Sequence, residues 1–478
     1  MATVAVPSIE LSSRKSDDAA GYSSRFDAFG FPLHDALLLL PTSLARPLAT
    51  KASSRHHRAW AQYWWLVATE RGTRMPASLP RPSNDLRILV AEGVPVAFRG
   101  ALWPLLLGVR QRQRDQPAVR YRELCEPPPS ASEASASTDA DVIEAAEQIE
   151  RDLDRTWPGH ERLDRDALRR VLVAFARSVP EVGYCQGLNS LGATLLLVMS
   201  EEDAYWALVL LVTRQLEPGF YSRTLWRSRA EQEVLRALVG ALEPRFLRAL
   251  HGYRFDIEHF CTSWFLCLFA GVLPMEVCMR VWDLICFVPA GDGATVILAA
   301  ALALLRVMRK PLAAAARAGP AELLRELEKG PAALQPGKAG GGDRFIAELL
   351  LRLAWLRERR GELAQQRERA CARVRAQAAR MQEVRDGTRD AKEARAADEA
   401  DRLAAAREAR VAWRAPPTSR GAVPVAFSGR FSKKKAPAGG AGRTIQPAVG
   451  RPSGKKASLA STDGVGTELN DIGMNARL

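Results

Sequence analysis

Hydrophobic residues between positions 85 and 356 recur at the spacing of one helix face. Leu168, Val171, Leu172 and Phe175 stand at i, i+3, i+4 and i+7, which places their side chains on one side of an α-helix. The run from 188 to 199 repeats this spacing, with leucines or methionine at 188, 191, 195 and 199. Alternating strand patterns bounded by Asn-Gly turns are absent from the sequence. The pattern therefore predicts an all-α fold for residues 85–356.

Segments of different composition divide the rest of the chain. Residues 1–84 read as an N-terminal segment with one aromatic-rich helix (AWAQYWWLVA). Residues 126–141 (EPPPSASEASASTDAD) read as a low-complexity linker inside the helical domain. Such a polar, Pro- and Ser-rich stretch cannot bury enough apolar surface to fold. Residues 415–478, rich in Pro, Gly, Ser and Lys, predict a disordered basic tail.

Residues 357–414, rich in Ala, Arg and Glu, predict one long charged helix. Leu349, Leu356 and Leu363 begin a seven-residue spacing that then fades. A coiled coil needs an apolar seam sustained over several heptads. Two interpretations remain open, a solvated charged helix and a weakly dimerising coiled coil.

The positive charge of the chain is concentrated near its C-terminus. Residues 357–478 hold 26 Lys and Arg against 14 Asp and Glu, whereas residues 1–356 hold 42 against 40. A nucleic-acid-binding domain needs a local excess of positive charge. The near-neutral body therefore argues against nucleic acid as a partner.

The cysteines and the apolar runs indicate a reduced, intracellular protein. The seven cysteines form no CxxC pair and no Cys/His cluster with zinc spacing. No signal peptide is evident at the N-terminus, and the apolar run from 294 to 305 is too short to span a bilayer. We expect a cytoplasmic protein, with a peripheral association with endomembranes as a further hypothesis.

Ile149, Asp152 and Arg155 are three residues apart, so on a helix they would occupy one narrow arc. Ile149 would anchor the helix in the core, and Pro158 would end it soon after Arg155. By residue chemistry alone, Asp152 and Arg155 could be an ordinary surface ion pair.

Gln186 stands between two glycines in the stretch GYCQG, residues 183–187. A glutamine here could simply satisfy the backbone of its own turn. Cys185, its neighbour, has no His or Asp placed by the sequence to activate it as a nucleophile.

Four stretches occur in order along the chain: GVPVAFRGALW, IERDLDRTWPGH, GYCQG and WFLCLFAGVLPMEVCMRVWDL. Together they resemble the TBC domain, the catalytic module of GTPase-activating proteins for Rab-family small GTPases. The resemblance runs from about residue 86 to 306 and is expected to continue to 356. It implies a two-lobed helical domain.

The resemblance also implies roles for individual residues. In TBC domains the arginine of IxxDxxR and the glutamine of YxQ are inserted into the active site of the GTPase, and these match Arg155 and Gln186. Asp152, Tyr184, Gly187 and Arg99 would support these two finger residues, and Gly187 would let the backbone pass close to the partner. The remaining motif residues would be fold determinants: Ile149, Trp103, Trp264, Pro274, Trp282 and Asp283.

The function implied by the resemblance is stimulation of GTP hydrolysis by a GTP-bound Rab-family GTPase in membrane traffic. GTP and Mg²⁺ would belong to the partner, and the chain would need no cofactor or metal and would hydrolyse no nucleotide itself. One alternative is a non-catalytic Rab-binding scaffold. Another is an adaptor whose tail, with GRFSKKKAP and RPSGKK, contacts an anionic membrane surface.

Overall fold

A computed structural model describes residues 84–413 except 117–120, 127–136, 336–340 and 389, together with His56, residues 58–60 and Tyr63. The described part contains helices and no strand, which confirms the all-α prediction. Most of the N-terminal aromatic helix and all of the tail from 415 lie outside it. The elements are α4 (Asn84–Glu92), α5 (Val96–Leu107), α6 (Val109–Asp115), α7 (Tyr121–Leu124), α8 (Ser137–Leu153), α9 (Arg165–Ser178), α10 (Leu188–Leu196), α11 (Glu201–Leu210), the π-helical η1 (Leu211–Gln215), α12 (Trp226–Leu242), α13 (Pro244–Gly252), α14 (Glu258–Leu266), α15 (Met275–Phe287), α16 (Gly293–Val307), α17 (Arg309–Ala318), α18 (Pro320–Lys329), the 3₁₀-helical η2 (Gly330–Ala333), α19 (Gly342–Glu358), α20 (Arg360–Arg385) and α21 (Ala391–Ala412).

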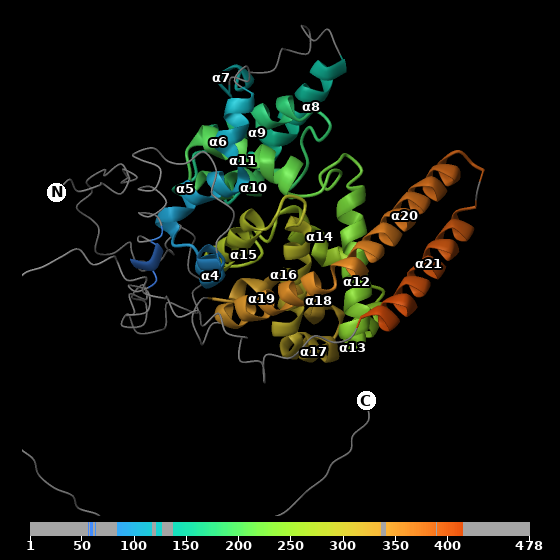
Figure 1. The fold of residues 1–478 in the computed structure, drawn as a ribbon. Helices are drawn as coiled ribbons and strands as arrows, with labels where there is room; N and C mark the ends of the chain where they lie inside the picture. Colours follow the sequence, from blue (N-terminus) through green and yellow to red (C-terminus); the bar gives the residue numbers. More distant parts are fainter. Residues whose placement is uncertain are drawn as a thin grey trace, which may run out of the picture. The chain divides into compact units, whose positions relative to one another are not determined.

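The helices pack as two groups (Figure 1). In the first, α9 packs against α8, α10 and α11. In the second, α16 packs against α12, α15 and α19. Helix α5 contacts both α11 and α15 and so joins the groups. This arrangement agrees with the two-lobed helical fold expected from the sequence.

The predicted helix face from Leu168 to Phe175 is realised on α9, where Leu168, Val171, Leu172 and Phe175 are all fully buried. Ser200 caps α11 by accepting a hydrogen bond from the amide of Asp203. Helix α9 thereby anchors the N-terminal side of the loop that contains Gln186.

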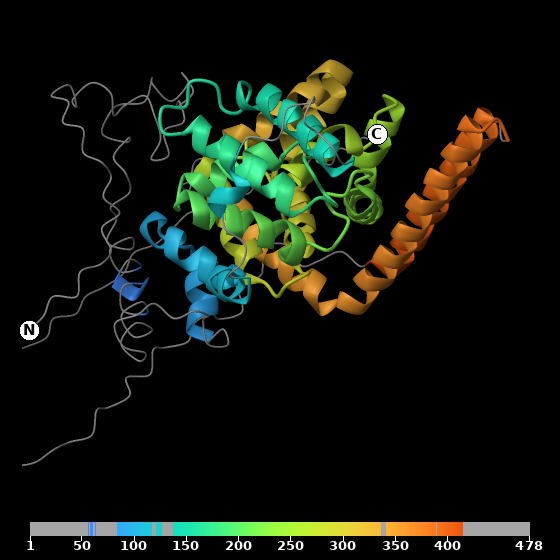
Figure 2. The ribbon, with the colours of Figure 1, turned by 90° about the horizontal axis from the view of Figure 1, so that it is seen from above.

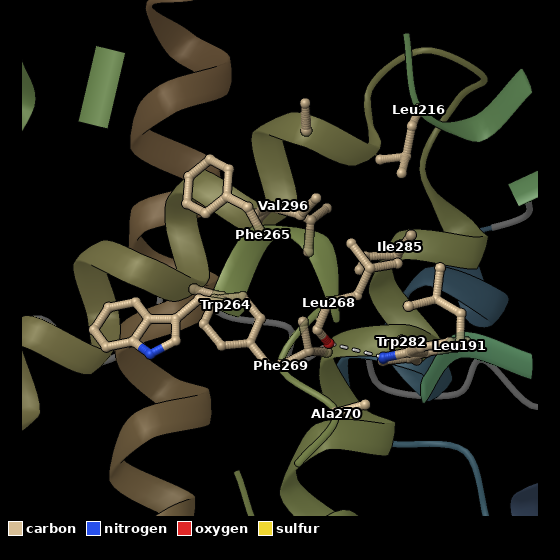
Figure 3. Close-up of a cluster of buried hydrophobic side chains, with 14 of the residues drawn as sticks. Leu191, Leu216, Trp264, Phe265, Leu268, Phe269, Ala270, Trp282, Ile285 and Val296 are labelled. Carbon is tan, nitrogen blue, oxygen red and sulfur yellow. Dashed lines mark hydrogen bonds between the residues drawn. The ribbon is translucent and has the colours of Figure 1, made fainter. Parts of the chain in front are cut away.

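The core of the second group contains the apolar run of residues 294–305. Helix α16 is buried along almost its whole length, because other helices cover it on several sides. Aromatic and aliphatic side chains from α14, α15 and the segment between them fill the adjoining space, among them Trp264, Phe265 and Trp282 (Figure 3). No helix in the described part of the chain is long and apolar enough to cross a membrane.

The linker predicted for residues 126–141 extends too far toward the C-terminus. Helix α8 already begins at Ser137, so residues 137–141 are helical, whereas 127–136 lie outside the described residues. The helix is stabilised by an apolar stripe that includes Ala145, Ile149 and Leu153, all buried. Tertiary packing thus extends the helix into a segment whose composition favours a loop.

The single long helix predicted for residues 357–414 is wrong. Two antiparallel helices, α20 and α21, form a hairpin (Figures 1 and 2). Gly387 adopts a left-handed φ of 72° at the turn, and Asp390 caps α21 by accepting hydrogen bonds from two backbone amides. Across the hairpin, Arg380 forms ion pairs with Asp398 and Asp401.

The hairpin packs against α12 of the same chain. The guanidinium of Arg367 lies 2.8 Å from the buried carboxylate of Glu231, and Arg229 donates to Gln377 at 2.8 Å. Leu349, Leu356 and Leu363, which begin the seven-residue spacing, are all buried within the chain. A freely solvated helix is therefore excluded, and these leucines are not available as a dimer seam.

Candidate finger site

The arginine motif occupies the C-terminal end of α8. Ile149 and Asp152 are buried on one face of the helix, as their spacing predicts. The helix ends at Leu153, so Arg155 stands in the following turn, where its side chain is 60% exposed. Arg155 forms an ion pair with Asp152. Trp157, just before Pro158, has a φ of 44° and is far from helical geometry.

The glutamine motif lies in the turn between α9 and α10. Gln186 is exposed, and its side-chain amide makes no hydrogen bond with the residues that the structure describes. The alternative in which this amide satisfies its own turn is therefore not realised. The amide oxygen and nitrogen are both free to bond a partner.

Asp152 connects the two motifs through its two carboxylate oxygens. Oδ1 pairs with Arg155, and Oδ2 accepts a hydrogen bond of 2.7 Å from the hydroxyl of Tyr184. Burial of the phenol, and then its hydrogen bond to Asp152, raise the pKa of Tyr184 above its usual value. Tyr184 consequently remains a neutral donor at physiological pH.

A close approach of two backbones requires glycine at position 187. Gly187 has a φ of 105°, and a Cβ atom there would lie 2.7 Å from the carbonyl oxygen of Leu266. We expected this glycine to admit the partner protein, but the crowded contact is with α14 of the same chain. The end of α14 thus supports the Gln186 turn from inside.

Thr156 and Asn189 belong to the site although the sequence motifs did not indicate them. The hydroxyl of Thr156 donates to the carbonyl oxygen of Asp152 at 2.6 Å, and the Asn189 amide donates to Thr156 Oγ1 at 2.7 Å. The oxygen of Asn189 accepts from the Gly187 amide at 3.1 Å. The one available signal was a polar Asn at the start of a largely apolar helix.

Cys185 has the properties of an unreactive thiol. Burial raises the pKa of Cys185 to about 11, so the thiol is protonated at neutral pH. Nucleophilic chemistry requires the thiolate. This agrees with the sequence, which places no activating residue near Cys185.

Arg99 lies with the residues expected to be fold determinants and not with Arg155 and Gln186. Its guanidinium binds Asp283 of α15 through two hydrogen bonds of 3.0 Å, and Trp103 donates to the same carboxylate at 3.0 Å. Its expected support of Arg155 and Gln186 is therefore not direct. The reason is topological, because α5 packs against α15 through this face.

The other fold residues of the fourth motif lie on α14, on α15 and between these helices. Trp282 stacks on Trp103 with ring centroids 5.8 Å apart. It also donates to the carbonyl of Leu268 at 2.9 Å (Figure 3). Trp264 is buried in the same region, and Pro274 directly precedes α15 as its N-cap residue. These residues shape the segment after α14. Leu266, the last residue of α14, lies against Gly187.

Comparison with known proteins agrees with this arrangement. Residues 97–313 match the family model of the Rab-GTPase-TBC domain. The crystal structure of the Chlamydomonas flagellar RabGAP TBC domain superposes with a TM-score of 0.52 and 25% identity, covering 68% of this chain and 99% of that one.

Among curated proteins, small G protein signaling modulator 3 of Bos taurus is 34% identical over 292 residues, which are 60% of this chain and 36% of that protein. TBC1 domain family member 2A of Ailuropoda melanoleuca is 38% identical over 209 residues, which are 42% of this chain and 22% of that protein. The chain thus matches roughly a third or less of the length of these relatives.

Proposed function

We propose, since the chain belongs to the Rab-GTPase-TBC family through residues 97–313, that it accelerates GTP hydrolysis by a Rab-family GTPase in its GTP-bound form. Domains of this family act without a cofactor of their own, because GTP and Mg²⁺ belong to the partner GTPase. The chemistry that this chain supplies then comes from side chains inserted into the partner's active site.

Arg155 and Gln186 have suitable chemistry for that role. GTP hydrolysis requires an attacking water held in line with the γ-phosphate and neutralisation of charge that develops on the phosphate oxygens. The guanidinium of Arg155 is permanently charged and its planar fork matches phosphate oxygens. The amide of Gln186 can accept a hydrogen bond from water and donate one to a phosphate.

The observation that carries the proposal is the exposure of Arg155 and Gln186 in two turns that one buried carboxylate connects through Tyr184. Arg155 is 60% exposed, whereas Asp152 beneath it is 2% exposed. When Arg155 leaves Asp152 for a phosphate, the hydroxyl of Tyr184 still partners that carboxylate. The buried carboxylate therefore keeps a hydrogen-bond donor when the arginine is released, which lowers the cost of that release.

Phosphate release from a panel of GTP-loaded Rab GTPases, measured with the full chain, tests the proposal. Wild type should accelerate one or a few GTPases, and Arg155→Ala and Gln186→Ala should each lose that acceleration by a factor on the order of 10³. Arg151→Ala is the matched control, since Arg151 is an exposed arginine of α8, shortly before the turn that contains Arg155. Binding without acceleration by wild type would favour the non-catalytic scaffold instead.

We further propose that the basic tail brings the activity to anionic endomembranes and thereby to membrane traffic. The tail from 415 lies outside the described residues, and the proposal is supported by its basic clusters alone. Basic residues near an anionic surface contribute about 1 kcal/mol each. Co-sedimentation of the full chain and of a chain ending at 414, with anionic and with neutral vesicles, tests it. Equal sedimentation of the two chains with anionic vesicles would refute it.

A further inference from the structure

The side chain of Asn189 is hydrogen-bonded to the residue that follows each finger. Thr156 follows Arg155 and accepts a hydrogen bond from Asn189 Nδ2 at 2.7 Å. Gly187 follows Gln186, and its amide donates to Asn189 Oδ1 at 3.1 Å. Asn189 and Thr156 are both buried. One planar amide thus connects the turn after α8 with the turn before α10.

The hydrogen-bond directions fit an asparagine at this position. Thr156 uses its single hydroxyl proton to donate to the carbonyl of Asp152, so its oxygen must accept from Asn189. The Gly187 amide is a donor, so it requires an acceptor on the other side. Side-chain amides carry a donor and an acceptor on one rigid group, whereas a leucine offers neither and a carboxylate offers acceptors alone.

This connection differs from the one made by Asp152. The ion pair between Asp152 and Arg155 must break when the arginine moves to a phosphate of the partner. The Thr156–Asn189–Gly187 connection involves no finger side chain, so it persists while both fingers are inserted. It also bonds the residue directly after each finger, whereas Tyr184 lies two residues before Gln186.

We propose that Asn189 is a positioning residue that fixes the separation of the Arg155 and Gln186 turns, so that both side chains enter the GTPase together. The proposal rests on the GTPase-activating function proposed above. Asn189 itself touches neither water nor phosphate in this role. Small displacements of catalytic groups slow the reaction strongly, so losing the connection should lower the stimulated turnover rate about 10- to 100-fold.

Asn189→Ala, which removes both hydrogen bonds, and Thr156→Val, which removes the hydroxyl at nearly constant volume, are the test variants. Thr156→Ser should restore near wild-type turnover. Thr194→Val is the matched control, because Thr194 is a buried threonine of α10 whose hydroxyl bonds the carbonyl of Ser190 and not a finger turn. It should lose a similar amount of thermal stability and keep its turnover rate.

Two binding measurements separate positioning from general damage. Asn189→Ala should bind a Rab loaded with a non-hydrolysable GTP analogue as tightly as wild type. It should bind the GDP–aluminium fluoride complex, which mimics the transition state, about 10-fold or more weakly. Equal weakening of both complexes, or an unchanged turnover rate, would overturn the proposal.

A third measurement is independent of the proposed GTPase activation. In the free full-length chain, Thr156→Val should speed amide hydrogen exchange at Gly187, in the other turn, whereas Thr194→Val should not. If wild type activates no GTPase but this cross-turn effect appears, the proposed function fails and the connection stands. If the exchange at Gly187 is unchanged, Asn189 does not couple the turns, whatever the activity.

Discussion

Arg99 and Asp283 form a two-point ion pair in the interior of the protein. Nε and Nη2 of Arg99 each lie 3.0 Å from one carboxylate oxygen, and the side chains are 3% and 0% exposed. The Trp103 indole and the Val94 amide also donate to Asp283. The first and fourth sequence motifs therefore meet at one fully bonded carboxylate.

Arg99→Ala should lower the free energy of unfolding by about 3–5 kcal/mol, because it removes the two-point partner of a buried carboxylate and leaves only Arg280, at 3.9 Å, as an ion-pair partner among the described residues. Denaturant unfolding of the two chains measures this difference. Arg110→Ala is the control, since Arg110 makes a similar two-point contact with Asp203 but is 47% exposed. Arg110→Ala should lower the free energy of unfolding by less than about 1 kcal/mol. Equal losses of stability in the two variants would contradict the role of burial.

Gly187→Ala should impair both stability and the proposed GTPase activation. The φ of 105° strains any other residue, and the added Cβ would collide with the carbonyl of Leu266. Unfolding by denaturant and phosphate release measure the two effects, and we expect a stability loss of about 2 kcal/mol or more. Gly159→Ala has a comparable left-handed φ of 72° with no atom within 4 Å of the new Cβ. It should show the backbone strain without the collision. An equal loss of stability in Gly159→Ala would refute a contribution from the contact with Leu266.

The α20–α21 hairpin should be needed for the stability of the folded domain, although the family match ends at residue 313. A chain ending at 358 loses Arg367 and so leaves the buried Glu231 with Arg227, at 3.7 Å, as its remaining ion-pair partner among the described residues. It also uncovers one side of α12. Thermal unfolding should show a midpoint lower by several degrees.

A chain ending at 414 is the control for that truncation, because it keeps α21 and Trp413, which packs near Trp355. Its unfolding midpoint should match that of the full chain. A chain ending at 358 that unfolds at the wild-type temperature would show that the hairpin is an appendage.

Local pattern predicted most of the helical body, and short motifs indicated Arg155 and Gln186 as candidate finger residues. The faces of α8 and α9 follow from periodicity, and Arg155 and Gln186 follow from short motifs with fixed spacing. Contacts between distant segments were not visible to the same reasoning. The hairpin depends on pairing α20 with α12, and Arg99 depends on a partner 184 positions away. Asn189 carries no pattern of its own, since its role appears when two turns are brought together in space.

Glu201 provides a test of electrostatics at the junction of α7, α9 and α11. Its carboxylate receives two hydrogen bonds of 2.8 Å from Arg170 and one of 2.8 Å from the hydroxyl of Tyr121. Arg170, and to a smaller extent Tyr121, hold the pKa of Glu201 below its usual value. Folding therefore favours the ionised carboxylate, and the resulting stability is present above the unfolded pKa of about 4.3.

This stability should be lost as the pH falls from about 5 through the lowered folded-state pKa of Glu201. Wild type should then exceed Glu201→Gln in free energy of unfolding near pH 7, by up to about 1 kcal/mol at this partly exposed site. The difference should shrink as the pH approaches 3. Denaturant unfolding between pH 3 and 7 measures it, with Glu202→Gln, an exposed neighbour, as the control. A difference that stays constant down to pH 3 would mean that Glu201 contributes through hydrogen-bond geometry and packing and not through its charge. A titrating carboxylate must lose its contribution to stability once the folded protein takes up the same proton as the unfolded chain.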